Sequence, residues 1–168
     1  TGYKKALPLL LNGLEKLEYR GYDSAGIAII DAETKNITCN KAEGKLKNLK
    51  NNLSDKNISG TVGIGHTRWA THGKPEVRNA HPHTDSSGTV AVVQNGIIEN
   101  FQDLKNKLEI EGIVFNSDTD TEVIPHLIQK ELNTLSKLKL ENNGSTLLVA
   151  VRNVISDLEG SYALAVLW

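Results

Sequence analysis

Cysteine and methionine are scarce in this sequence of 168 residues. Cys39 is the only cysteine, so an intrachain disulfide is excluded and nothing indicates an oxidising compartment. We therefore expect a cytoplasmic protein. Methionine is absent, and the chain opens on Thr1 without a signal-peptide pattern, which predicts a fragment of a longer protein.

An excess of charge and long apolar runs are also lacking. Lys and Arg number 19 and Asp and Glu number 20, so the net charge of −1 gives no basic field for nucleic acid or an anionic membrane. No apolar run approaches the roughly 20 residues of a membrane helix. Nothing marks a linker or an internal repeat, so we expect one domain over residues 1–168, with a core of aliphatic side chains because Phe and Trp occur only twice each.

Apolar residues at steps of three and four predict four helices, and short aliphatic or alternating runs predict five strands. Thr119 and Glu122 have the spacing of a capping box before the third helix, and Gly160 is placed to end the fourth. The predicted helices cover residues 7–19, 97–108, 123–132 and 145–158, and the predicted strands cover residues 25–30, 37–41, 61–66, 89–94 and 161–168.

Four of the five histidines fall within 18 residues that begin at the end of the strand predicted over residues 61–66. They are His66, His72, His81 and His83. A metal centre is one interpretation, because imidazole is a common ligand and His81-Pro82-His83 is an HxH pair. Against it, the sequence has no helical His-x-x-x-His pair and few carboxylates nearby, so we predict no metal and no cofactor. Histidines that hydrogen-bond a polar loop are the alternative.

Two dipeptides carry groups that could bind an anion. Arg68 and Trp69 place a planar, permanent charge beside a stacking surface, which suits a small carboxylate, although an isolated arginine more often forms a surface ion pair. Asn95-Gly96 alone favours a tight turn. Because the strand predicted over residues 89–94 ends there and a helical pattern follows, we expect a strand-to-helix corner that presents two oxyanion donors, the Asn95 amide and the Gly96 N–H.

Alternating acids at Asp118, Asp120 and Glu122 resemble the start of a calcium loop. Val123 and Gln129 stand where such a loop needs glycine and glutamate, so calcium is excluded. The acids are instead expected to stabilise a helix N-terminus, with Asp118 or Asp120 free to reach a ligand ammonium.

Five segments, in order and spacing, resemble one family. They are residues 17–26 (LEYRGYDSAG), 65–73 (GHTRWATHG), 79–83 (NAHPH), 95–100 (NGIIEN) and 119–122 (TDTE). Together they resemble the glutaminase domains of the glucosamine-6-phosphate synthases, a branch of the class-II glutamine amidotransferases. The resemblance implies an α+β fold of four αββα layers, the N-terminal-nucleophile hydrolase fold, with two stacked antiparallel sheets.

The same resemblance implies roles in the hydrolysis of L-glutamine. Arg68 is expected to hold the substrate carboxylate and Asp120 its α-ammonium, while Asn95 and the Gly96 N–H stabilise the oxyanion. The other expected site residues are Trp69, Thr71 and His72 in a loop that closes over glutamine, and Arg20, Tyr22, His66 and His81 behind these groups. Gln94 is a departure, since relatives often carry histidine there.

The family's nucleophile is an N-terminal cysteine whose own α-amine is the base. No cysteine precedes the first predicted helix, and Thr1 lies too close to helical Pro8 to act from a buried strand. Cys39 is expected to be a small buried hydrophobe in the middle of a strand. We therefore expect the chain to be truncated at both ends and inactive by itself.

The resemblance also implies partners. Ammonia would pass to a separate isomerase domain, absent from this chain, that converts fructose 6-phosphate to glucosamine 6-phosphate, and the complete enzyme would be a homo-oligomer. Two other functions stay open on the residues alone: a glutamine-binding regulatory module without catalysis, and a metal-dependent hydrolase that uses the histidines.

Overall fold

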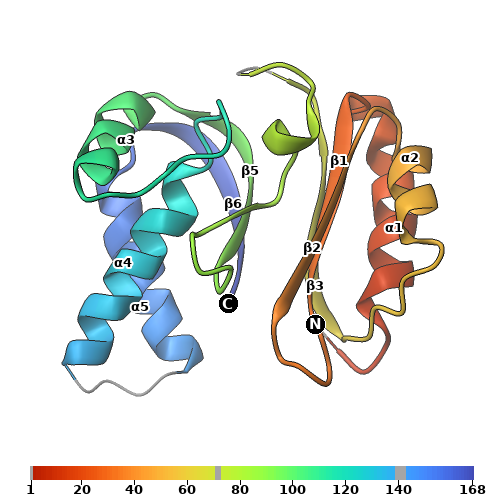
Figure 1. Ribbon diagram of the computed structural model, residues 1–168, viewed down its shortest axis with the longest axis horizontal. Coiled ribbons are helices and arrows are strands. Elements are labelled where there is room, and N and C mark those ends of the chain that lie inside the picture. The colour runs from red at the N-terminus through yellow and green to blue at the C-terminus, as the bar shows by residue number, and fades with distance from the viewer. Residues whose placement is uncertain (1, 71–72, 139–142) are drawn as a thin grey trace.

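The computed structural model describes residues 2–70, 73–138 and 143–168. Two antiparallel sheets lie face to face in the middle, and helices cover the outer face of each (Figure 1). The first sheet has the order β2-β1-β3. Its strands are β1 (Ser24–Ile30), β2 (Ile37–Glu43) and β3 (Val62–Arg68), and its helices are α1 (Ala6–Leu17), η1 (Glu18–Arg20) and α2 (Leu46–Leu53).

The second sheet has the order β4-β5-β6, with three helices against its outer face (Figure 1). Its strands are β4 (His83–Thr84), β5 (Ala91–Ile98) and β6 (Gly160–Leu167), and its helices are α3 (Phe101–Ile110), α4 (Val123–Lys137) and α5 (Gly144–Asp157). A short 3-10 helix, η2 (Val77–Asn79), lies on the connection between β3 and β4. Within the described ranges, no helix combines the length and the apolar character needed to cross a membrane.

Strand alternation divides the core into layers. Ile27 and Ile29 of β1 are fully buried in the cluster that includes residues of α1 and α2, whereas Ala28 between them belongs to a cluster with Ala91 and Leu167 of the other sheet. Successive side chains of a strand point to opposite faces, so β1 supplies large residues to the helices and a small one to the space between the sheets. The small residues let the sheets approach each other at this end.

The expectation that the Asn95-Gly96 dipeptide lies at a strand-to-helix corner was wrong. It lies inside β5, where Asn95 is opposite Ala163 and Gly96 opposite Tyr162, and the next helix begins only at Phe101. The apolar pattern at residues 97–98 fits a strand as well as a helix, and pairing with β6, which is distant in sequence, decides between them.

Two other local predictions were wrong, and one helix was not predicted. Glu122 forms no capping box, because its carboxylate accepts hydrogen bonds from the backbone N–H of Asn116 (2.9 Å) and Ser117 (2.7 Å). Gly160 does not end α5, which stops at Asp157; it opens β6 with a φ of +125°. Helix α2 was missed because it is short and rich in Lys and Asn, although its leucines recur at helical spacing.

Candidate active site

A cavity of about 420 Å³ lies between the end of β3 and the middle of β5. It brings together eight residues that the sequence predicted for the site: Arg20, His66, Arg68, Trp69, His81, Asn95, Gly96 and Asp120. Tyr22 is at its border, with its ring 5.6 Å from that of Trp69. Thr71 and His72 lie outside the described residues. Segments from both sheets thus form one cavity, as expected for a site at the junction of two layers.

Two opposite charges are buried in the cavity wall. Arg68 ends β3 and is 5% exposed, and Asp120 on the connection to α4 is 4% exposed. Burial lowers the pKa of the Arg68 guanidinium, while the nearby carboxylates of Asp23 and Asp120 raise it. Arginine keeps its proton in proteins, so the cavity holds a permanent cation beside a carboxylate. This pair is complementary to the α-carboxylate and α-ammonium of an amino acid.

Hydrogen bonds orient both charged groups. The Arg68 guanidinium donates to the carbonyl oxygens of Gly73 (3.3 Å) and Lys74 (3.5 Å). Asp120 accepts from the backbone N–H of Ile98 through Oδ2 (2.7 Å), so the acid is attached to the same strand that carries Asn95. Both charged groups are therefore held by backbone atoms, which restrict their motion more than flexible side chains would.

Asn95 and Gly96 lie side by side on the cavity wall, and both are exposed to it. Gly96 has a φ of +129°, and a Cβ at this position would collide with the carbonyl oxygen of Ser161. Both facts require glycine. Main-chain atoms therefore form the wall beside the Asn95 carboxamide, and the two residues can offer an N–H pair to a developing oxyanion.

Three histidine rings form a row next to the cavity. His66 stacks on His81 with ring centroids 4.6 Å apart, and His81 meets His83 edge to face at 5.0 Å. Nδ1 of His81 accepts from the Gln94 N–H (3.3 Å), and its Nε2 lies 3.2 Å from the Thr121 hydroxyl, which itself donates to Gln94 Oε1 (2.6 Å). Only the neutral ring protonated on Nε2 satisfies all three bonds.

Burial keeps this row of histidines neutral. It lowers the pKa of His66 to about 4, with Arg68 adding repulsion, and it lowers the pKa of His83 to about 3, with Lys41 adding repulsion. The pKa of His81 falls well below its usual value for the same first reason. The residues that the structure describes contain no group of three or more His, Cys, Asp or Glu side chains arranged to hold a metal ion.

Acid should therefore destabilise this protein. An unfolded histidine titrates near 6.5 and folded His66 near 4, so the stability held by neutral His66 is present above pH 6.5 and is lost as the pH falls toward 4. Between pH 7 and pH 5 this loss amounts to about 2 kcal/mol. We expect urea unfolding to show it, with a smaller fall in His66→Gln, which does not titrate. An equal fall in both proteins would contradict the assignment.

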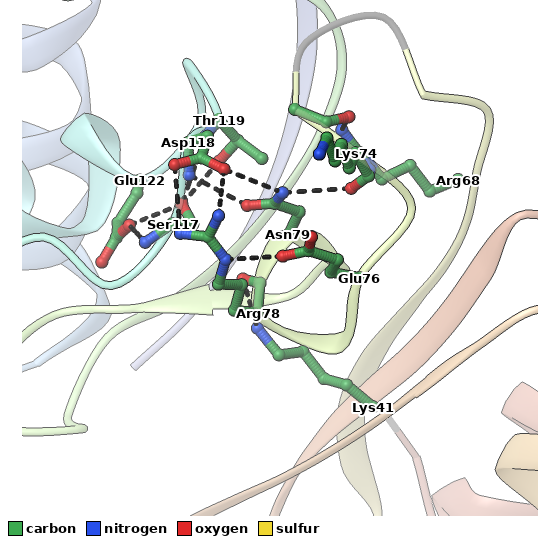
Figure 2. Close-up of polar contacts among 11 residues, drawn as sticks. Lys41, Arg68, Lys74, Glu76, Arg78, Asn79, Ser117, Asp118, Thr119 and Glu122 are labelled. Atoms are coloured by element: carbon green, nitrogen blue, oxygen red, sulfur yellow. Dashed lines mark hydrogen bonds and ion pairs between the residues drawn. The ribbon is translucent and has the colours of Figure 1, made fainter.

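Asp118 does not face the cavity. Its carboxylate is paired with both terminal nitrogens of Arg78, and Nη1 lies 3.0 Å from Oδ1 (Figure 2). The alternative left open by the sequence, Asp118 or Asp120 as partner of a ligand ammonium, is thereby narrowed to Asp120.

Glu122 is ionised at neutral pH. Burial by itself raises the pKa of Glu122, but hydrogen bonds, several of them from Asn116 and Ser117, hold this pKa well below its usual range.

Two residues that contact the site were not among the predicted site residues. Gln94 is 3% exposed and lines the cavity, and its Oε1 accepts from Thr121. The signal for Gln94 was a polar residue at the end of an aliphatic strand. Thr121 gave no comparable signal, because its contact depends on how the segment before α4 packs against β5.

The fold is that of the glutamine amidotransferases. Residues 24–139 match the glutamine amidotransferase domain family, and the chain belongs to it. It is 31% identical to glutamine phosphoribosylpyrophosphate amidotransferase from B. subtilis, complexed with ADP and GMP, with a TM-score of 0.75 over 99% of this chain and 33% of that one. The predicted αββα fold of N-terminal-nucleophile hydrolases, with two stacked antiparallel sheets, is thereby confirmed.

Curated relatives share a higher sequence identity with this chain than that solved structure does. The chain is 53% identical over 166 residues to the glutamine–fructose-6-phosphate aminotransferase (isomerizing) of Thermosynechococcus vestitus, covering 99% of this chain and 25% of that protein. It is 50% identical over 165 residues to the enzyme of the same name from Clostridium tetani, covering 98% of this chain and 25% of that protein. The chain spans about a quarter of the length of these curated relatives.

Proposed function

We propose that this chain is the glutaminase domain of a glutamine–fructose-6-phosphate aminotransferase. Within the complete protein this domain hydrolyses L-glutamine to glutamate and ammonia, and an isomerase domain of the same protein uses the ammonia to make glucosamine 6-phosphate from fructose 6-phosphate. The observation that carries the proposal is the cavity in which a buried guanidinium, a buried carboxylate and Asn95-Gly96 meet. The names of the relatives support the acceptor sugar.

The proposed chemistry begins with orientation of the amino acid. Arg68 binds the α-carboxylate and Asp120 binds the α-ammonium, which directs the side-chain amide toward Asn95. A cysteine that precedes residue 1 in the complete protein attacks the amide carbon as a thiolate, after its α-amine has taken the thiol proton. The oxyanion that forms accepts hydrogen bonds from the Asn95 carboxamide and the Gly96 N–H.

The tetrahedral intermediate then loses ammonia. The protonated α-amine returns its proton to the leaving nitrogen, and the C–N bond breaks to leave a thioester. Water attacks the thioester with the same amine as base, which releases glutamate and regenerates the thiol.

The single cysteine of the chain supports a cytoplasmic setting for this reaction, and the resemblance supports a homo-oligomeric enzyme.

The test is an assay of the complete protein with L-glutamine, with and without fructose 6-phosphate. We expect glutamate in both cases and glucosamine 6-phosphate only when the sugar phosphate is present. Binding of glutamine without release of glutamate would identify a regulatory module instead. Turnover that follows the content of a bound metal, measured by elemental analysis, would identify a metal-dependent hydrolase.

Replacing Arg68 by lysine should raise KM for glutamine in the complete protein by about tenfold or more, because an ammonium cannot make the bidentate contact of a guanidinium. The inhibition constant of L-glutamate should rise in parallel, since the product carries the same α-carboxylate. Arg152→Lys, on the exposed side of α5, is the matched control and should leave both constants unchanged. An unchanged KM in Arg68→Lys would remove Arg68 from the substrate site.

A further inference from the structure

Asn79, at the end of η2, joins two segments that border the cavity. Its side chain is fully buried, with Nδ2 donating to the carbonyl oxygen of Lys74 (3.0 Å) and Oδ1 accepting from the N–H of Asp118 (2.9 Å) (Figure 2). Because a backbone N–H can only donate, the Asp118 bond fixes which end of the amide is oxygen. The other end must then face Lys74.

The carbonyl that Asn79 holds also faces Arg68. Nη1 of the guanidinium lies 3.5 Å from the Lys74 oxygen, and Nη2 lies 3.3 Å from the Gly73 oxygen. Gly73 itself packs on the Asn79 amide, since a Cβ there would be 2.8 Å from Nδ2, and its φ is +78°. Residues 73–74 are therefore packed between the Asn79 amide and the Arg68 guanidinium.

The opposite end of the Asn79 amide holds the segment that leads to Asp120. Asp118 donates its N–H to Asn79, and its carboxylate is paired with Arg78, whose Nε donates to Glu76 (2.8 Å). Asp120 follows two residues later, inside the cavity wall. One buried amide thus connects the backbone that orients the cation with the backbone that carries the anion.

We propose that Asn79 is a positioning residue that sets the separation between Arg68 and Asp120, and thereby adapts the cavity to an α-amino acid. The inference rests on the proposed function, since it concerns the two groups that would bind the α-carboxylate and α-ammonium of glutamine. Asn79 acts through these groups and does not line the cavity.

Burial predicts which part of this network matters. Removing the fully buried Asn79 side chain would leave a cavity and would take from the Asp118 N–H its acceptor, which is costly. The Lys74 oxygen would lose one donor and keep the Glu76 N–H (2.8 Å) and Arg68. The Arg78 and Asp118 side chains are each 49% exposed, so water can replace their ion pair at little cost. Asn79 variants should therefore have a much larger effect than Arg78→Ala.

The experiment uses the complete protein and measures kcat and KM for glutamine. We expect Asn79→Ala to raise KM by about tenfold or more, with kcat reduced less than about threefold, because both α-groups shift while the groups at the reacting amide stay in place. Asn79→Asp, of nearly equal size, should behave alike, since its carboxylate would face the Lys74 oxygen and the Asp118 carboxylate. Arg78→Ala should change KM by less than about threefold.

A double-mutant cycle separates positioning from general damage. If Asn79 acts through Arg68, then Asn79→Ala should add little to KM in an Arg68→Lys background. Asn48→Ala is the matched control, because the Asn48 amide also donates to a carbonyl (Glu43, 2.9 Å) but lies exposed on α2. It should leave KM unchanged.

Three outcomes would overturn the inference: an unchanged KM in both Asn79 variants, effects of Asn79→Ala and Arg68→Lys that simply multiply, or failure of both Asn79 variants to fold, which would make Asn79 a residue of the folding core. Failure of the proposed function looks different. In that case the wild-type protein itself would neither bind nor hydrolyse glutamine.

Discussion

Alanine in place of Asn95 is expected to lower kcat for glutamine hydrolysis in the complete protein by about 10² to 10³, with KM changed by less than about threefold. The Asn95 carboxamide lies on the cavity wall beside Gly96, and its backbone is paired to β6. A hydrogen bond from such a preorganised donor strengthens as negative charge develops on the substrate oxygen. It therefore contributes to the transition state far more than to substrate binding.

The expected split between kcat and KM also defines the contrary result. If Asn95→Ala raised KM and left kcat unchanged, Asn95 would bind the ground state of the substrate and the oxyanion role would be wrong. Asn95→Asp provides a second measurement, because it keeps the size of the side chain but replaces its N–H donors by a carboxylate. It should lower kcat at least as much as alanine does.

Asn95 and Gly96 line the cavity, as the predicted pair of oxyanion donors requires, yet their local structure was predicted wrongly. The sequence at residues 95–98 is compatible with a strand or a helix, and the choice depends on β6, which lies more than sixty residues away. The oxyanion proposal survives because it needs only an amide and a glycine side by side on the cavity wall. A strand provides this as well as a corner does.

Arg68 could be singled out from the residue types alone, and so could Asp118 and Asp120 as alternatives, whereas the choice of Asp120 came from the family resemblance. A guanidinium beside a tryptophan and an acid before a helix suggest ligand contacts without knowledge of the fold. Asn79 and Thr121 could not be found this way. Their importance comes from burial and from partners on other segments, which only the packing of the two sheets brings together.

The histidines also show a limit of prediction from sequence. Their spacing allowed a metal site or a polar loop, and the structure shows the rings of His66, His81 and His83 in contact, with burial lowering the pKa of each. The hydrogen bonds that fix the His81 tautomer involve Gln94 and Thr121, which are distant in sequence. A sequence pattern cannot reveal the desolvation that keeps such rings neutral.

Cys39 should play no part in catalysis, despite being the only cysteine of the chain. It lies within β2 opposite Ala28, with Sγ 3.9 Å from the Pro82 oxygen, and it does not occur among the described residues that line the cavity. Burial raises the pKa of its thiol, and Lys41 lowers it by a smaller amount. The thiol therefore stays protonated at neutral pH, and a protonated thiol is a poor nucleophile.

A polypeptide limited to residues 1–168 is accordingly expected to release no glutamate from glutamine above the uncatalysed rate. The proposed nucleophile is a cysteine that precedes residue 1, and binding groups alone cannot replace its thiolate or the α-amine that serves as base. In the complete protein, Cys39→Ser should keep kcat and KM within about twofold of wild type, as expected for a thiol outside the reacting groups. Glutamate production by the shorter polypeptide that disappears in Cys39→Ser would make Cys39 the nucleophile and overturn the mechanism. Joining a Cys-Gly strand with a free α-amine to the same polypeptide should restore hydrolysis, which distinguishes a missing nucleophile from a failure to fold.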